Sequence, residues 1–213
     1  MLELWLLRHG ETDWNSAHRW QGQTDVPLNA AGMKQAGRVA HRLRAERFDA
    51  VYSSDLGRAR MTALLAYPHG TPIFDMRLRE LSFGKLEGKR WDDMTQVERR
   101  VVETWWNDPY ADCLPDGESY KQLEERLVEW RSTLPKAGRF LVVTHGGPIR
   151  SLLWEIMGVP RNRSWTVLLD NCSLTRLSYH EERATVVTVN DCAHLDDNVV
   201  MLEGEAEPRA GKS

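Results

Sequence analysis

Two histidines follow short apolar runs, where the chain can present reactive groups. Arg8 and His9 follow an apolar run at residues 4–7, and His145 follows another at residues 140–144. A neutral imidazole can act as a nucleophile, and a guanidinium offers a planar fork of donors that fits phosphate oxygens. A single histidine after a strand is more often a hydrogen-bonded structural residue, so neither histidine alone establishes catalysis.

The surrounding pattern predicts strands that alternate with helices. Buried strands are predicted at residues 4–7, 48–53 and 140–144, and the last third, with runs at 166–169, 173–179 and 184–190, is predicted to be rich in strands. Apolar residues at helical spacing predict helices at about 29–46, 56–67, 91–106, 119–134 and 149–157. Asn29 is a predicted N-cap, and Ser119 with Gln122 is a predicted capping box.

This alternation favours an α/β fold, a three-layer α/β/α sandwich with a mostly parallel central sheet. In such sheets ligands bind beyond the carboxyl ends of the strands. His9 and His145 both fall at such ends. We therefore expect them to face each other across one pocket.

The segment LLRHGETDWN at residues 6–15 resembles the signature of the histidine phosphatase superfamily, the phosphoglycerate mutase-like proteins, in which RHG carries the nucleophile. Other segments match that family in order: QGQTDVPLNAAG at 21–32, SSDLGRARMTA at 53–63, LRELSFGKLEG at 78–88, PDGES at 115–119, VVTHGG at 142–147 and NDCAHL at 190–195. The resemblance covers residues 1 to about 197 and implies a phosphoglycerate mutase-like fold.

The resemblance implies a phosphomonoester hydrolase that works through a phosphohistidine on His9. A transferring phosphoryl group spreads negative charge over three oxygens, which Arg8 and Arg58 can bind. These cations would also lower the pKa of His9 and keep its imidazole neutral. By resemblance, His145 is the second histidine that helps hold the phosphoryl group.

Further residues match family positions around the phosphate. Asn15, Gln21 and Gly22 correspond to residues that line the pocket, and the Gly146 amide, at a helix start, can donate to the same oxygens. The family match places the proton donor at Glu80, because cleavage of the ester needs an acid and then a base for water. Glu87 is expected to make a structural contact instead.

The resemblance also sets the expected organisation. Residues 1–198 form the expected domain, with a helical lid insertion at about 89–135, and residues 199–213 are expected to be a disordered tail. Mutases that resemble this chain carry a longer insertion between the proton donor and the second histidine. A short lid admits water more readily, so we favour a phosphatase.

Two alternatives remain open. One is a cofactor-dependent phosphoglycerate mutase, and the other is a non-catalytic protein that binds phosphorylated ligands. The second conflicts with the intact set of Arg8, His9, Arg58, Glu80 and His145. The substrate is a small phosphorylated molecule: a sugar phosphate, a phosphoglycerate or a nucleotide-like ester such as ribazole phosphate. Trp105 and Trp106 could line its pocket, although an aromatic stripe at helical spacing usually belongs to a core.

Composition narrows the partners. The net charge is -3 and the sequence contains no long block of Lys or Arg, so neither nucleic acid nor anionic lipid is an expected partner. The three cysteines are widely spaced, and no apolar run reaches the length of a membrane span, so we expect a cytoplasmic protein. The seven histidines lack the close pairing of a zinc site, and we expect no metal or cofactor. A homodimer through an edge strand of the last third is possible.

Overall fold

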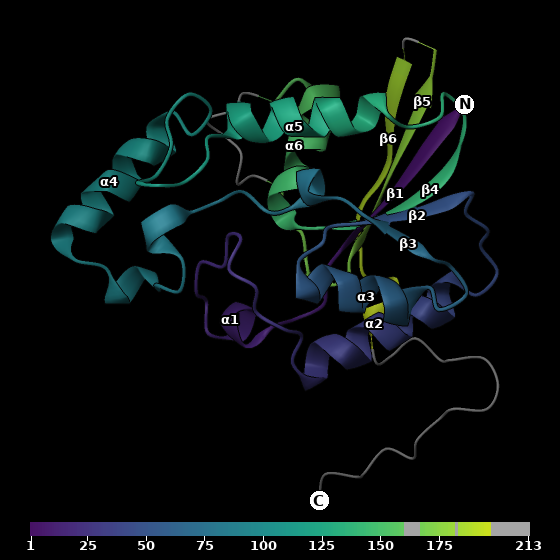
Figure 1. Cartoon of the computed structure of the whole chain (residues 1–213), viewed down its shortest axis with the longest axis horizontal. Coiled ribbons are helices and arrows are strands. Elements are labelled where there is room, and N and C mark those ends of the chain that lie inside the picture. The colour runs from purple at the N-terminus through teal and green to yellow at the C-terminus, as the bar shows by residue number, and fades with distance from the viewer. Residues whose placement is uncertain (160–166, 182, 197–213) are drawn as a thin grey trace, which may run out of the picture.

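The computed structural model describes residues 1–159, 167–181 and 183–196 and contains one six-stranded sheet in the order β3-β2-β4-β1-β5-β6 (Figure 1). The strands are β1 Leu2–Arg8, β2 Ala50–Ser53, β3 Pro72–Phe74, β4 Gly138–Thr144, β5 Leu174–His180 and β6 Arg183–Asp191. The four strands from β3 to β1 pair in parallel, and β5 and β6 run antiparallel. The expected mostly parallel sheet is confirmed.

Helices cover both faces of this sheet. They are α1 Asp13–Ser16, α2 Ala30–Leu43, α3 Gly57–Ala66, α4 Gln96–Asn107, α5 Tyr120–Ser132 and α6 Gly146–Met157. Helices α2 and α3 lie on one face, whereas α5 and α6 lie on the other (Figure 1). The fold is the three-layer α/β/α sandwich that the sequence predicts.

Strand β1 shows why the sequence of a central strand is apolar throughout. Leu4 and Leu6 pack into the core beneath α5 and α6, while Trp5 and Leu7 pack into the core beneath α2 and α3. Successive side chains of a strand point to opposite faces, and both faces of this sheet are covered. The continuous apolar run is therefore the pattern of a strand buried on two sides.

The helix-capping predictions are confirmed. The Asn29 side chain accepts a hydrogen bond from the Gly32 amide at 2.8 Å. In the capping box, the Gln122 amide donates to Ser119 Oγ at 3.3 Å and the Ser119 amide donates to Gln122 Oε1 at 2.8 Å. These bonds satisfy amides that the first turn of a helix leaves without partners.

Other boundaries differ from the predictions. Helix α4 begins at Gln96 rather than at Trp91, because Thr95 and Glu98 form a capping box there and residues 91–93 form a separate 3-10 turn. Strand β3 and the four-residue α1 were not predicted, since elements this short carry no measurable periodicity.

The strand predicted at 166–169 is wrong for residues 167–169, which form no strand, and residue 166 lies outside the described residues. The predicted tail at 199–213 also lies outside them.

The predicted lid segment at 89–135 has two different parts. Helix α5 lies beside α6 and buries Leu123, Leu127 and Trp130 in the core. Helix α4 extends away from the sheet (Figure 1). The lid role of this segment stays a prediction.

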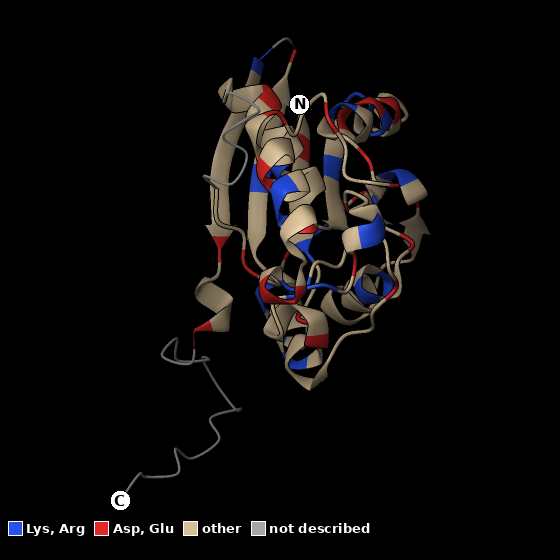
Figure 2. Ribbon diagram, turned by 90° about the vertical axis from the view of Figure 1, so that its left-hand side faces the viewer, with Lys and Arg blue, Asp and Glu red and all other residues tan. Residues whose placement is uncertain are grey.

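Charges of both signs are interspersed along the described chain. Figure 2 shows Lys and Arg alternating with Asp and Glu across the helices and loops. Within the same described residues, no helix is both long enough and apolar enough to span a membrane.

Candidate active site

The register of two neighbouring strands brings the predicted histidines together. Strands β1 and β4 pair in parallel with Arg8 opposite Thr144, so His9 and His145 leave the sheet side by side. Their ring centroids are 5.0 Å apart. The His9 amide donates to the Thr144 carbonyl at 2.9 Å, which fixes the turn that carries it.

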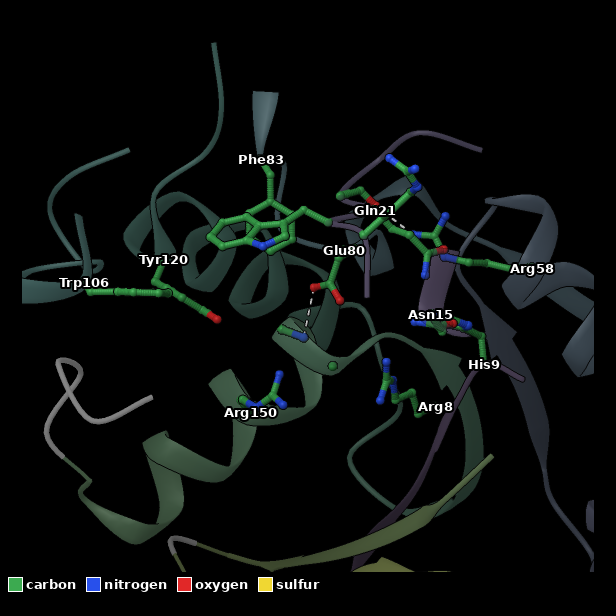
Figure 3. A pocket seen from close by; sticks show the side chains of 15 residues that line it. Arg8, His9, Asn15, Gln21, Arg58, Glu80, Phe83, Trp106, Tyr120 and Arg150 are labelled. Carbon is green, nitrogen blue, oxygen red and sulfur yellow. Dashed lines mark hydrogen bonds between the residues drawn. The ribbon is translucent and has the colours of Figure 1, made fainter. Parts of the chain in front are cut away.

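A pocket of about 510 Å³ opens at these strand ends (Figure 3). Its lining includes every predicted site residue except His145, which is fully buried behind it. The lining residues are Arg8, His9, Asn15, Arg19, Trp20, Gln21, Gly22, Arg58, Glu80, Phe83, Trp106, Tyr120, Gly146, Gly147 and Arg150.

His9 is held as a neutral ring in a single tautomer. Its Nδ1 lies 2.7 Å from the Gly10 carbonyl oxygen, which can only accept a hydrogen bond, so Nδ1 carries the proton. Burial lowers the pKa of His9 well below 6.5, and the charges of Arg58 and Arg8 lower it further. Nε2 therefore keeps its lone pair at neutral pH.

Arg58 is fully buried and partly committed to the protein. Its Nη1 donates to the Thr24 carbonyl at 2.8 Å and its Nη2 to the Gly22 carbonyl at 2.6 Å. A guanidinium has five N–H donors, so donors remain for a ligand. Burial lowers the pKa of Arg58 to about 10, so the group stays cationic at neutral pH.

Arg8 also presents a donor at the pocket. Its Nη1 donates to the Leu169 carbonyl, while its Nε is buried and has no hydrogen-bond partner among the described residues. Burial lowers the pKa of Arg8, whereas the Glu80 charge opposes that shift. A buried donor without a partner is costly, so an anion at this position would stabilise the site.

His145 contacts Arg58 rather than the pocket. Arg58 Nε donates to His145 Nδ1 at 3.3 Å, and His145 Nε2 lies 2.9 Å from Ser54 Oγ. Because Nδ1 accepts, the ring proton lies on Nε2 and donates to Ser54. Burial lowers the pKa of His145 well below 6.5 and keeps the ring neutral. Its direct contact with a phosphoryl group stays a prediction.

Glu80 is oriented by two backbone amides. Its Oε1 accepts from the Leu81 amide at 2.8 Å and from the Gly147 amide at 2.9 Å (Figure 3). A Cβ on Gly147 would lie 2.2 Å from that oxygen, so the contact requires glycine. The second oxygen, Oε2, lies 3.7 Å from the Cβ position of Gly146, on the pocket side.

The loop at residues 21–24 is held by Glu87, as expected of a structural contact. The Glu87 carboxylate accepts from the amides of Gln23 at 3.0 Å, Thr24 at 2.9 Å and Phe83 at 3.1 Å. Gly22 has φ +53°, and a Cβ there would lie 2.0 Å from Glu87 Oε1. The loop can therefore turn at this position only with glycine.

Asn15 turns its amide nitrogen toward the pocket. Its Oδ1 accepts from the Thr12 amide at 3.1 Å and from Asn171 Nδ2 at 3.2 Å, which leaves Nδ2 as the group that can reach a ligand. Asn171 also donates to the His9 carbonyl at 3.0 Å. The sequence interpretation missed Asn171, because no motif marks the turn before β5.

Several residues of the pocket wall were also missed. Arg150 lies in the otherwise apolar α6, one helical turn after Gly146, and that spacing was the available signal. Tyr120 had been interpreted only as part of a helix. Trp105 is buried with 2% of its surface exposed, whereas Trp106 is 40% exposed and lines the pocket. The adjacent tryptophans thus serve different purposes.

No cluster of three or more His, Cys, Asp and Glu side chains suited to a metal ion occurs in the described ranges.

Comparison with known proteins gives the family. Residues 4–192 match the histidine phosphatase superfamily (branch 1). A curated protein from Salmonella arizonae named "Probable phosphoglycerate mutase GpmB" is 39% identical over 206 residues, which cover 92% of this chain and 96% of that protein.

Solved structures share the fold. Bacillus stearothermophilus YhfR is 30% identical with a TM-score of 0.84, covering 92% of this chain and 100% of that one. The alpha-ribazole phosphatase from Shigella flexneri is 27% identical with a TM-score of 0.76, covering 89% of this chain and 96% of that one. On these grounds the chain belongs to the histidine phosphatase superfamily, branch 1, and is an enzyme of the phosphatase type.

Proposed function

We propose that this enzyme hydrolyses small phosphomonoesters in two steps through a phosphohistidine on His9. The observation that carries the proposal is the neutral His9 ring, with its Nε2 lone pair available, between the cations Arg8 and Arg58. A nucleophile must be unprotonated, and the phosphoryl oxygens need fixed positive charge around them. Both conditions are met in one pocket.

In the first step, His9 Nε2 attacks phosphorus and the P–O bond to the leaving group breaks. Protonated Glu80 gives its proton to the departing oxygen, so an alcohol leaves and Glu80 becomes a carboxylate. The free donors of Arg8 and Arg58, with Asn15 Nδ2, bind the charged equatorial oxygens.

In the second step, the Glu80 carboxylate takes a proton from water as the water oxygen attacks phosphorus. The P–N bond breaks, inorganic phosphate leaves, and His9 regains its Nε2 lone pair. Glu80 is protonated again and ready for the next ester.

His145 acts as a positioning residue in this scheme. Its neutral Nδ1 accepts from Arg58 Nε at 3.3 Å, and its Nε2 is fixed by Ser54. The histidine thereby sets the direction of the Arg58 guanidinium fork.

The other expectations become part of the proposal. A cytoplasmic location is supported by the three cysteines, all of which are free thiols. The interspersed charges and the net charge of -3 support a small-molecule partner rather than nucleic acid. A homodimer could pair through β6, which lies at an edge of the sheet; light scattering tests the oligomeric state.

A phosphoglycerate mutase is the second candidate, because the curated relatives at 39% identity carry that name. A substrate panel that includes 3-phosphoglycerate, scored for both isomerisation and phosphate release, separates the two. We expect phosphate release that persists in the presence of a chelator. Isomerisation faster than release would favour the mutase, and binding without either reaction would favour a non-catalytic protein.

A further inference from the structure

The pocket wall across from His9 determines which leaving group the enzyme accepts. In an in-line displacement the leaving oxygen lies opposite the attacking nitrogen, which places it beside Glu80. Beyond Glu80, Figure 3 shows Tyr120 and Arg150 on the side away from His9. This inference rests on the proposed function, because it uses the direction of attack.

Arg150 lies next to the proton donor. Its Nη1 is 2.9 Å from the Cβ position of Gly146, and Glu80 Oε2 is 3.7 Å from the same point. Arg150 Nε donates to the Val167 carbonyl at 3.1 Å, which helps to hold the guanidinium at the wall. A glycine at position 146 leaves the space that this cation occupies.

Tyr120 adds a neutral donor beside Arg150. Its ring stacks on Trp105 at a centroid distance of 6.3 Å and an interplanar angle of 13°, and it contacts Trp154 at 4.8 Å. These contacts fix the ring, and Figure 3 shows the hydroxyl pointing into the pocket. Burial raises the pKa of Tyr120, and the Glu80 charge adds to that effect, so the hydroxyl keeps its proton.

The charge of the pocket exceeds what a phosphoryl group needs. Arg19 pairs with Asp93 at 3.3 Å, which leaves the other three lining arginines, Arg8, Arg58 and Arg150, facing the single lining carboxylate, Glu80. When Glu80 is in its acid form, three positive charges meet the two negative charges of a phosphomonoester. The difference is one positive charge, and Arg150 is the arginine on the leaving-group side.

We propose that Arg150 and the Tyr120 hydroxyl bind a second acidic group, a carboxylate or another phosphoryl, on the leaving group. A guanidinium fork fits two oxygens of either acid, and the hydroxyl donates to one of them. The preferred substrates are therefore phosphomonoesters of acids, and Arg150 is a specificity-determining residue.

Two matched substrate pairs test this assignment. 3-Phosphoglycerate and glycerol 3-phosphate differ by a carboxylate in place of a hydroxymethyl group, and fructose 1,6-bisphosphate and fructose 6-phosphate differ by a second phosphoryl. We expect kcat/KM for phosphate release to be about 10- to 100-fold higher for the acidic member of at least one pair, the range for a hydrogen bond between charged groups. The responding pair identifies the acid.

The variant Arg150→Gln should lose most of that preference, because it falls about 10- to 100-fold on the acidic substrate and much less on its partner. Arg19→Gln is the matched control, since it removes a pocket arginine that pairs with Asp93, and it should keep the preference. Hydrolysis of p-nitrophenyl phosphate by Arg150→Gln shows that the variant is folded.

No preference in either pair, or an equal loss by Arg150→Gln on both members of the responding pair, overturns the assignment. Hydrolysis of p-nitrophenyl phosphate by the parent enzyme keeps the two proposals separate. If the parent hydrolyses that ester without any preference for acids, only the second acidic group is refuted. If it hydrolyses no ester, the proposed function itself fails.

Discussion

The chemistry of the site depends on which atoms its neighbours leave free. Gly10 takes the Nδ1 proton of His9, so Nε2 is the nucleophilic atom. Two amides hold one oxygen of Glu80, and the other oxygen lies on the pocket side. Each group is thus oriented by backbone contacts before a substrate binds, which reduces the reorganisation needed in the transition state.

Replacement of Glu80 by Gln tests the proton donor. Glutamine keeps the hydrogen bonds to both amides but cannot give up a proton to an alkoxide. Hydrolysis of alkyl phosphates should fall about 10²- to 10⁴-fold, and hydrolysis of p-nitrophenyl phosphate should fall far less. Steady-state kinetics on both ester classes measure this; equal losses on the two would mean that another acid protonates the leaving group.

At the scale of elements, the start of α6 positions the acid through a glycine. The Gly147 amide is 2.9 Å from Glu80 Oε1, and a side chain there would enter the space of that oxygen. Gly37, within α2, has nothing within 4 Å of its Cβ position. The two glycines therefore predict opposite effects of the same substitution.

Gly147→Ala should displace the Glu80 carboxylate and lower kcat on alkyl phosphates by about tenfold or more, because the acid loses its alignment. Gly37→Ala should keep kcat and stabilise the fold by about 0.5–1 kcal/mol, since alanine loses less backbone entropy in a helix. Kinetics and urea denaturation of both variants check this. An unchanged kcat in Gly147→Ala would contradict the role of the helix start.

The elements also show what the sequence could predict. The apolar runs located the strand ends, and the parallel register then placed His9 beside His145. Arg150 and Tyr120 were missed because they come from helices, and the face that a helix turns toward a pocket depends on how it packs against its neighbours. The orientation of His145 toward Arg58 was likewise set by tertiary contacts that no local pattern encodes.

At the scale of the whole molecule, the buried histidines couple stability to pH. Burial and neighbouring arginines lower the pKa of His9 and of His145 well below 6.5 in the folded protein. The unfolded chain therefore binds more protons below about pH 6.5. The stability that these rings contribute is complete above that pH and is lost as the pH falls toward their folded values.

The free energy of unfolding should therefore fall below pH 6.5, by up to about 1.4 kcal/mol per pH unit for each histidine. Urea denaturation between pH 5 and pH 7.5 measures the slope. The double variant His9→Ala with His145→Ala, compared with the parent, should show a shallower dependence over this range. The same slope in both proteins would mean that other groups carry it.

The most direct test of the central claim is rapid-quench trapping with a substrate that carries a labelled phosphoryl group. The parent enzyme should acquire an acid-labile label on His9 during turnover, and His9→Ala should acquire no label and release no phosphate. Phosphate release by the parent without a labelled enzyme, or turnover by His9→Ala, would contradict a phosphohistidine on His9.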